Sequence, residues 1–482
     1  MFIVGIEPKA PGLHIFGQHY SPRLGLPQLC TIAENMGHAC RIFCEEIAPI
    51  VWSDVARADM ILLSSITSTA PRAYALIPKI REINPQAPIL MGGPHCTFLP
   101  QEALAKGVDY VFRHEADETF PKFLEWWGSN KELTKLREIP GLSFLVDGEY
   151  LFTPDPPWVD LDTLPTPNFE LIHGFKNPSA ITVITSRGCP WDCEFCSEIA
   201  MFGRKYRFRS THKVLEDIRR YYDRYGKLTI FFGDDNIAAN PIRLRDLCQG
   251  LIDIKKMIRG CSGQVRLDIA KNPADVALMR QANFDRFYIG YESTNDASLL
   301  ASGKGITYEG IVRYTKEIHR QGIMIHAMWV IGFDEDTLET VRENVRASIR
   351  LHLETSQFLI LVPIPGAAIY ERFKSEGRIF SNDWSKFDGH HVTFVPKQMS
   401  ARQLQIAVML KAMPKIYSLQ QTVKIFILAN LASALGRFRR RSWHPLHDLK
   451  MNIYTFIARV WGRRAIRKNK KQTREYLESI PK

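Results

Sequence analysis

The 482-residue sequence predicts an α/β protein with two parallel-sheet units and a helical C-terminal region. Short apolar runs of strand length alternate with helix-like segments over residues 1–135, and the alternation returns over residues 180–382. A proline-rich passage separates the two series, as expected of a linker. We therefore predict a doubly wound, Rossmann-like domain at 1–135, a linker at 136–179, a partial (β/α)6 barrel at 180–382 and a mostly helical region at 383–482.

The first unit contains five apolar runs of strand length: FIVGI, ACRIF, MILLSSI, APILMGG and VDYVFR. Between them lie segments with helical spacing and Gly or Pro punctuation, such as PQLCTIAENMG and RAYALIPKIREI. Strands that alternate with helices form βαβ units, so the sheet is expected to be mainly parallel. Ligands of such a sheet bind beyond the carboxyl ends of its strands, where TST (67–69) and GGPHCT (92–97) stand.

The second unit begins after a passage that includes TPDPPWVDLDTLPTPNF (153–169). Its six strand candidates are ITVITSRG, LTIFFGDD, QVRLDIA, RFYIGYES, MIHAMWVIGF and QFLILVPIPG. Helical segments separate these runs, which is the order of a partial (β/α) barrel. Polar or glycine residues stand at the carboxyl end of each strand, the face where such barrels place their sites.

Composition restricts the class of protein. The chain is 45% hydrophobic and 24% charged, which is ordinary for a folded protein. The opening MFIVGIEP predicts a strand rather than a signal segment, and the nine cysteines are an odd number, so we expect a reduced, cytoplasmic compartment. The stretch IFILANLASALG (425–436) is shorter than the roughly 20 apolar residues that span a bilayer.

The net charge of +12 is concentrated near the end of the sequence. Residues 437–482 contain 14 Lys or Arg and 3 Asp or Glu, a net +11, so the other 436 residues carry +1. Apolar residues of the segment around 454–471 recur on one helical face with basic residues beside them; they are Ile453, Phe456, Ile457, Val460 and Trp461, flanked by Lys450, Arg459, Arg463 and Arg464. A basic amphipathic helix of this kind, reinforced by FRRRSW (438–443), lies in a membrane interface or packs its apolar face on the barrel.

Three cysteines lie close together in TSRGCPWDCEFC (185–196), directly after the first barrel strand. Cys189, Cys193 and Cys196 have the spacing C-x3-C-x2-C, and three thiolates suit a soft metal centre such as an iron–sulfur cluster. A four-iron cluster normally takes four protein ligands, so three would leave one iron open to a substrate or cofactor. Zinc is the alternative metal, but it needs a fourth Cys or His, for which only a distant residue such as His95 remains. The remaining alternative is that the three cysteines bind no metal.

The motif C-x3-C-x-φ-C, with Phe195 before the last cysteine, resembles the signature of the radical S-adenosylmethionine (SAM) superfamily. The resemblance continues through the barrel in four further motifs, in order and at barrel spacing: FFGDDNIAAN (231–240), IGYESTND (289–296), VIGFDEDT (330–337) and PIPGAAIYE (363–371). In that family the first of these holds the amino end of SAM, and the second supplies an acid to its ribose or amine.

The resemblance implies that Cys189, Cys193 and Cys196 bind a [4Fe-4S] cluster whose fourth iron takes the amino and carboxylate groups of SAM. The residues expected to contact SAM are Phe195, Asp234, Asp235, Glu292, Pro365 and Gly366. Carboxylates suit the ammonium and ribose hydroxyls of SAM, although Asp-Asp-Asn after a strand is also a common turn and helix cap. Arg266 on the third strand faces the SAM carboxylate or is structural.

The first unit resembles the cobalamin-binding domain that precedes the barrel in one branch of the superfamily. LLSSITST (62–69) resembles its S-x-L strand end, ILMGGPH (89–95) its G-G strand end, and RLGLPQLCTIAENMGH (23–38) the helix after its first loop. Paired glycines let a backbone approach a bulky ligand closely. The residues expected to contact cobalamin are Ser64, Thr67, Gly92, Gly93, Pro94 and His95.

One motif of the cobalamin domain is missing. Domains that bind cobalt through histidine carry D-x-H-x-x-G in the first loop, whereas GLHIFG (12–17) lacks the aspartate and lies too far from the helix start. We interpret His14 as a loop histidine and expect cobalamin to bind without a histidine ligand. A relic domain that packs on the barrel is the alternative. The remaining cysteines, Cys40 and Cys44 among them, are expected to be free.

Together these features predict a cobalamin-dependent radical SAM enzyme, similar in layout to anaerobic Mg-protoporphyrin ester cyclase and the hopanoid methylases. In that branch, methyl transfer to an unactivated carbon, with methylcobalamin as donor, is the commonest reaction. The likeness and the basic tail favour a hydrophobic, lipid-like small molecule as substrate. The alternatives are radical oxidation, cyclisation or rearrangement without methyl transfer, and, in another class, a non-catalytic metal-stabilised binding scaffold.

The family also implies an electron donor such as flavodoxin or ferredoxin. Nucleic acid is not an expected partner, because no RNA-binding module precedes the basic tail. We expect a cytoplasmic protein that associates peripherally with the inner face of the membrane through its basic C-terminal helices. Beyond the cluster no catalytic residue is predicted; the aromatic candidates for the barrel interior are Tyr291, His326, Trp329 and Tyr370.

Overall fold

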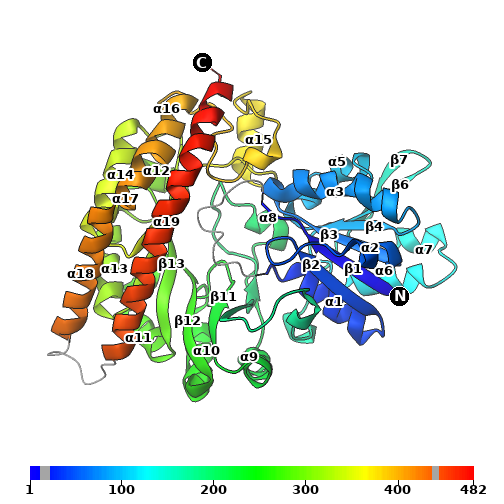
Figure 1. Cartoon of the computed structure of the whole chain (residues 1–482), viewed down its shortest axis with the longest axis horizontal. Helices are drawn as coiled ribbons and strands as arrows, with labels where there is room; N and C mark the ends of the chain where they lie inside the picture. The colour runs from blue at the N-terminus through cyan, green and yellow to red at the C-terminus, as the bar shows by residue number, and fades with distance from the viewer. Residues whose placement is uncertain (11–21, 437–444, 482) are drawn as a thin grey trace.

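The alternation of strands and helices predicted from the sequence is confirmed in both units. The structure, a computed structural model, describes residues 1–10, 22–436 and 445–481. The first unit lies on one side of the barrel, and the C-terminal helices lie on the other side (Figure 1).

The first sheet has seven strands in the order β2-β1-β3-β4-β5-β6-β7. Strands β1 to β5 are parallel, and β6 and β7 extend the sheet in antiparallel fashion. The bounds are β1 Phe2–Glu7, β2 Ala39–Cys44, β3 Met60–Ser64, β4 Ile89–Gly92, β5 Tyr110–Phe112, β6 Leu142–Val146 and β7 Glu149–Phe152. Both β6 and β7 fall within residues 136–179, the segment that the sequence predicts as a linker. Asp147 and Gly148 join them with φ angles of 52° and 85°, and Asp-Gly between apolar runs is a hairpin signal.

Helices cover both faces of this sheet, because successive residues of a strand point to opposite sides. Ile3 of β1 packs in the cluster that includes α1 and α6, whereas Val4 packs with the helices on the other face. The helices are α1 Gly25–Asn35, α2 Trp52–Arg57, α3 Ala70–Ile83, α4 Pro94–Phe98, α5 Pro100–Ala105, α6 Thr119–Trp127 and α7 Leu133–Arg137. With both faces covered, the carboxyl ends of the strands are the part of the sheet left to hold a ligand.

The second sheet has six parallel strands in the order β8-β11-β12-β13-β14-β15, which confirms the partial (β/α)6 barrel. The strands are β8 Ala180–Val183, β11 Leu228–Phe232, β12 Ile258–Val265, β13 Phe284–Glu292, β14 Met324–Ile331 and β15 Thr355–Ile360. The helices are α9 Thr211–Tyr225, α10 Pro241–Asp253, α11 Pro273–Gln281, α12 Asp296–Ala301, α13 Tyr308–Arg320, α14 Leu338–Arg350 and α15 Ala368–Ser375. After β8, a small hairpin of β9 (Ser186–Arg187) and β10 (Arg207–Phe208) encloses the cysteine loop and α8 (Glu198–Phe202).

Alternation along the strands separates the two faces of the barrel wall. Phe287, Ile289 and Tyr291 of β13 are fully buried, whereas the alternating Arg286 and Tyr288 are half-buried. The concave face of the sheet is therefore the more open one.

The four residues predicted as candidates for the barrel interior do not all lie on the concave face. The Tyr291 hydroxyl lies 2.6 Å from the Thr315 hydroxyl of α13, and the Tyr291 ring lies 5.1 Å from Trp329, so both aromatic residues belong to the outer core. His326 lies 4.9 Å from the Tyr288 ring on the concave face, where burial, and then the charge of a nearby arginine, lower its pKa to about 4. Tyr370 lies on α15, away from the strands.

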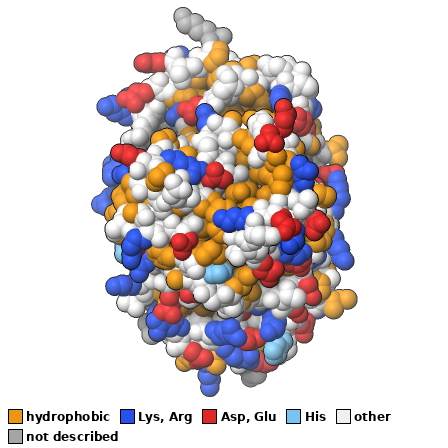
Figure 2. Space-filling view, turned by 90° about the vertical axis from the view of Figure 1, so that its right-hand side faces the viewer, with side chains coloured by type: hydrophobic (Ala, Val, Ile, Leu, Met, Phe, Trp, Pro, Cys, Tyr) orange, Lys and Arg blue, Asp and Glu red, His pale blue; other side chains and the backbone are white. Residues whose placement is uncertain are grey.

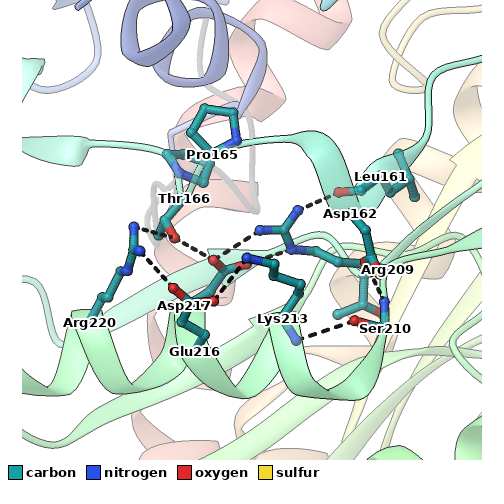
Figure 3. A network of polar contacts seen from close by, with 12 residues as sticks. Leu161, Asp162, Pro165, Thr166, Arg209, Ser210, Lys213, Glu216, Asp217 and Arg220 are labelled. Atoms are coloured by element: carbon teal, nitrogen blue, oxygen red, sulfur yellow. Dashed lines mark hydrogen bonds and ion pairs between the residues drawn. The ribbon is translucent and has the colours of Figure 1, made fainter. Parts of the chain in front are cut away.

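The segment between the two units, residues 153–179, makes hydrogen bonds with both of them. Figure 3 shows its contacts with α9: Asp217 accepts hydrogen bonds from the Thr166 hydroxyl and from Arg209, which also donates to the Leu161 carbonyl. On the other side, the Asn168 amide donates to the Thr31 hydroxyl of α1 at 2.7 Å. We call this segment the strap, because its contacts fix the two sheets relative to each other.

Within the described residues, the C-terminal region is mostly helical from Ala401, as predicted. It contains α16 Ala401–Gln405, a π-helical segment Ile406–Ala412, α17 Met413–Ile416, α18 Leu419–Gly436 and α19 Pro445–Ser479. Helices α18 and α19 form an antiparallel hairpin beside the barrel (Figure 1). FRRRSW (438–443) lies entirely in residues 437–444, outside the described residues. Within the described ranges, no helix is both long and apolar enough to cross a bilayer.

The inner face of α19 is not the apolar face predicted to pack on the barrel. Arg459 is fully buried there and donates to the carbonyls of Ile416 and Glu354, and Thr455 accepts from Arg286 at 3.2 Å. Of the predicted apolar face, Ile457 is exposed, whereas Phe456 packs against Phe426 of α18. The register of the helix is set by these polar contacts.

We expect Asp217→Ala to lower the free energy of unfolding by about 3 kcal/mol, because it leaves the buried Arg209 without its carboxylate partner at 3.0 Å. Asp223→Ala, on an exposed position of the same helix, is the matched control and should change it by less than about 0.5 kcal/mol. Urea denaturation of both variants measures the difference. Equal effects would show that the strap contacts do not hold the two units together.

Candidate cofactor site

A mainly apolar cavity lies where the carboxyl ends of β3 and β4 face the first strand of the barrel. Its walls come from the first unit, from the strap and from the start of the barrel. They include Leu24, Leu26, Ser64, Ser65, Ile66, Gly92, Gly93, Pro94, Leu161, Leu164, Pro165, Thr182, Ile184, Arg187 and Tyr221. The cavity therefore lies between the two units and depends on their relative position.

Four of the six residues predicted to contact cobalamin line this cavity: Ser64, Gly92, Gly93 and Pro94. Thr67 and His95 are buried but do not line it. The first turn of α4 carries His95 away from the cavity, and its ring packs 5.3 Å from Trp384 with Nε2 3.6 Å from a Glu102 carboxylate oxygen. The structure thus places His95 in the contact between the first unit and the C-terminal region.

The two glycines at the end of β4 serve different purposes. Gly93 has a φ of +107°, and a Cβ atom on it would lie 2.4 Å from the Ser65 carbonyl oxygen, so close backbone packing requires glycine there. At Gly92 the nearest atom to an added Cβ is 3.9 Å away, on Phe112. Because Gly92 has no side chain, nothing projects into the cavity from this part of its wall. The space left free suits a bulky ligand.

Four buried charges join the two units beside the cavity. Glu115 and Asp117 follow β5 in the first unit, and Arg187 and Arg207 belong to the β9–β10 hairpin. Arg187 lies 2.6 Å from Asp117, and Arg207 lies 2.5 Å from Glu115. Burial and the two acids act on Arg187 in opposite directions, and the acids prevail and raise its pKa. These pairs fix the hairpin that leads directly into the cysteine loop.

The three cysteines lie on that loop, with Cys189 and Cys193 half-buried and Cys196 exposed. Burial, and then the charges of Glu198 and Asp235, raise the pKa of Cys196 to about 12. Among the described residues, no three His, Cys, Asp or Glu side chains converge on a point where one metal ion would bind them. A cubane cluster does not need such convergence, because each thiolate binds a different iron.

Contacts from three parts of the barrel hold the cysteine loop. Arg372 of α15 lies 2.5 Å from Glu194 and 2.6 Å from Asp334, which follows β14. The rings of Phe195 and Phe333 are 5.7 Å apart. Arg266 lies over the Trp191 ring of the loop at 4.8 Å. These three contacts fix the loop on the barrel.

The two aspartates expected to contact SAM differ in their surroundings. Asp234 is fully buried and accepts hydrogen bonds from the amide and hydroxyl of Thr185 and from the Ser186 hydroxyl. It therefore shapes the start of the cysteine loop from within. Asp235 is exposed and shares a hydrogen bond with Glu198; burial and this neighbour raise the pKa of Glu198 to about 10. Asp235 is the aspartate that faces the cysteines.

The other residues expected to contact SAM have partners that the sequence does not reveal. Glu292 is buried, with a φ of +56°, and lies 2.7 Å from the ammonium of Lys304. The charges of Lys304 and Arg266 oppose the effect of burial, which raises the pKa of Cys193. Gly366, beside Pro365, has no room for a side chain, because an added Cβ would lie 2.3 Å from the Phe98 ring of the first unit.

Comparison with known proteins finds matches to two protein families in this chain. Residues 183–347 match the Radical SAM superfamily, and residues 22–124 match the B12 binding domain. An uncharacterized methyltransferase of Pyrococcus horikoshii is 28% identical over 76% of this chain and 81% of its own length. The bacteriochlorophyllide d C-12(1)-methyltransferase of Chlorobaculum tepidum is 24% identical over 75% of each chain. The solved structure of the cobalamin-dependent SAM radical enzyme OxsB shares the fold with a TM-score of 0.68 at 15% identity, over 99% of this chain and 83% of that one.

The chain combines a radical SAM domain with an N-terminal B12-binding domain, the layout of cobalamin-dependent radical SAM enzymes. It is an enzyme whose cofactors are a [4Fe-4S] cluster, SAM and cobalamin.

We expect Glu115→Gln to lower the free energy of unfolding by roughly 3 kcal/mol, because it leaves Arg207 buried beside a neutral group. Glu118→Gln removes an exposed carboxylate three residues away and serves as the control. Chemical denaturation of both variants tests this. A loss no larger than that of the control would mean that the buried ion pairs do not secure the interface between the units.

Proposed function

We propose that this enzyme transfers a methyl group to an unactivated carbon of a hydrophobic small molecule. The observation that carries the proposal is the cavity at the junction of the units, which runs from Gly92 at the end of β4 to Arg187 and Phe202, on either side of the cysteine loop. A ligand of the B12-binding domain in this cavity would therefore lie beside the loop proposed to hold the cluster. Methyl transfer between two cofactors requires that arrangement.

The residues proposed to hold the cluster are Cys189, Cys193 and Cys196. When bound, SAM at the cluster supplies radical chemistry and cobalamin supplies methyl transfer. The chain contributes position: Arg372 and Phe333 fix the cysteine loop, so the thiolates are held on a supported backbone.

The residues proposed to contact SAM are Phe195, Asp235, Glu292, Pro365 and Gly366. Asp235 offers an exposed carboxylate to an ammonium or hydroxyl group. On the other side of the loop lie the Glu292 carboxylate and the Lys304 ammonium. This pair matches the ammonium and carboxylate groups of the amino-acid part of SAM. Asp234 is proposed to act only by positioning, because its oxygens already accept hydrogen bonds from Thr185 and Ser186.

The residues proposed to contact cobalamin are Ser64, Gly92, Gly93 and Pro94, which line the cavity. A hydrophobic substrate is favoured by the apolar cavity and by the relative that is named a bacteriochlorophyllide d methyltransferase. We also propose an electron donor of the flavodoxin or ferredoxin class, and a cytoplasmic location with peripheral attachment to the inner face of the membrane.

We expect Cys193→Ala to abolish SAM cleavage, with a loss of at least about 100-fold, because the cluster loses one of its three thiolates. The test is anaerobic reconstitution with iron and sulfide, followed by quantification of 5′-deoxyadenosine and S-adenosylhomocysteine under reductant. Cys40→Ala, a half-buried thiol in the first unit, is the matched control and should retain cleavage.

The ratio of the two products decides the type of reaction. S-adenosylhomocysteine formed beside 5′-deoxyadenosine, and only when cobalamin is present, is the expected result for methyl transfer. Formation of 5′-deoxyadenosine alone, with cobalamin bound, would contradict it in favour of radical oxidation, cyclisation or rearrangement. Full cleavage by Cys193→Ala would contradict the proposed cluster ligands.

A further inference from the structure

The outward face of the α18–α19 hairpin carries two continuous apolar stripes. Large apolar side chains recur at every fourth residue on each helix, so they lie along one side of it. They are Leu419, Val423, Ile427 and Leu431 on α18, and Leu449, Ile453, Ile457 and Trp461 on α19, each between 39% and 52% exposed. Eight side chains of this size on adjacent helices make a surface larger than the scattered apolar residues of an ordinary soluble face.

The inner face of the same hairpin makes several polar contacts beside buried apolar residues such as Ala465 and Ile466. Arg459 and Thr455 attach α19 to the barrel, and Asn452 donates to Asn430 of α18 at 3.1 Å. The two helices also pack through Phe426 and Phe456, whose rings are 5.3 Å apart. A surface helix in water normally turns its apolar stripe inward. Here polar contacts hold the opposite orientation, so the apolar stripes are presented to something outside the chain.

The charge around the stripes is strongly positive. Residues 401–474 contain 17 Lys or Arg and a single Asp or Glu. On α19 the outward face continues beyond Trp461 as Arg464, Lys468 and Lys471, all exposed at three- or four-residue steps. On the face of the first unit, by contrast, basic and acidic side chains are interspersed (Figure 2). The hairpin thus joins an apolar surface to a basic one.

We propose that this face of the α18–α19 hairpin docks onto an anionic phospholipid bilayer, with the stripes in the acyl boundary and Arg464, Lys468 and Lys471 at the headgroups. The inference rests on the proposed peripheral location and assigns a surface to it. A bilayer satisfies both features, because apolar burial and attraction to anionic lipids act together at such helices. A second copy of the chain would cover the stripes but would bring two regions of like charge together.

The test is flotation of the full-length protein with vesicles of phosphatidylcholine, alone or mixed with phosphatidylglycerol. We expect binding to the mixed vesicles that falls as salt is raised. The triple variant Ile453→Ser, Ile457→Ser, Trp461→Ser should bind at least about tenfold more weakly. The triple variant Arg464→Glu, Lys468→Glu, Lys471→Glu should lose the preference for phosphatidylglycerol.

The matched control replaces two exposed apolar residues on barrel helices, Ile242→Ser and Leu300→Ser, which are 79% and 77% exposed. This control should bind vesicles like the unaltered protein. All variants change surface positions, so circular dichroism and SAM cleavage without lipid should be unchanged. Retained cleavage with lost vesicle binding separates this surface from the catalytic proposal.

Three results would overturn the inference. The first is no binding of the unaltered protein to mixed vesicles. The second is equal binding by the stripe variant and the control. The third is a dimer in sedimentation velocity that the stripe variant converts to monomer, which would identify a second copy as the occupant.

Discussion

The buried ion pairs between Glu115, Asp117, Arg187 and Arg207 are the constraint on which the rest of the site depends. They connect the end of β5 in the first unit to the hairpin that leads into the cysteine loop. Removal of one partner from a buried pair costs about 3–5 kcal/mol, so the two units are held in one relative position. The strap adds contacts to both units through Thr166 and Asn168, so the walls of the cavity between them are held in place by the chain itself.

This arrangement explains why a doubly wound domain precedes the barrel. Each sheet alone would present its strand ends to water, as parallel sheets do. In this protein the strand ends of the first sheet face the first strand of the barrel. The two sheets thereby enclose an apolar cavity beside the cysteine loop. The exposed apolar stripes of α18 and α19 form a second apolar surface, on the other side of the barrel. A protein that collects a hydrophobic substrate from a lipid surface would use both features.

Strand and helix order, both domain types and the cysteine loop were predictable, because they depend on local periodicity and on motif spacing. Residues brought together only by tertiary packing were not. Lys304 meets Glu292 because a loop after α12 folds back over the strand end, and nothing in its local sequence signals this. The direction of His95 depends on the first turn of α4, and the register of α19 depends on Arg459 rather than on the apolar pattern. The β6–β7 hairpin did leave a signal, the Asp147-Gly148 pair, inside a passage whose prolines suggested a linker.

The central claim is that the cavity at the junction of the units binds cobalamin beside the cysteine loop. The most direct measurement is the amount of hydroxocobalamin retained after anaerobic reconstitution of the unaltered protein and of Gly92→Leu. Because Gly92 has no close neighbour on its open side, leucine there should fill the cavity without disturbing the fold. We expect about one cobalamin per chain for the unaltered protein and at least tenfold weaker binding for the variant, with about four irons in both. Absence of cobalamin from the unaltered protein, or equal binding by the two, would contradict the account.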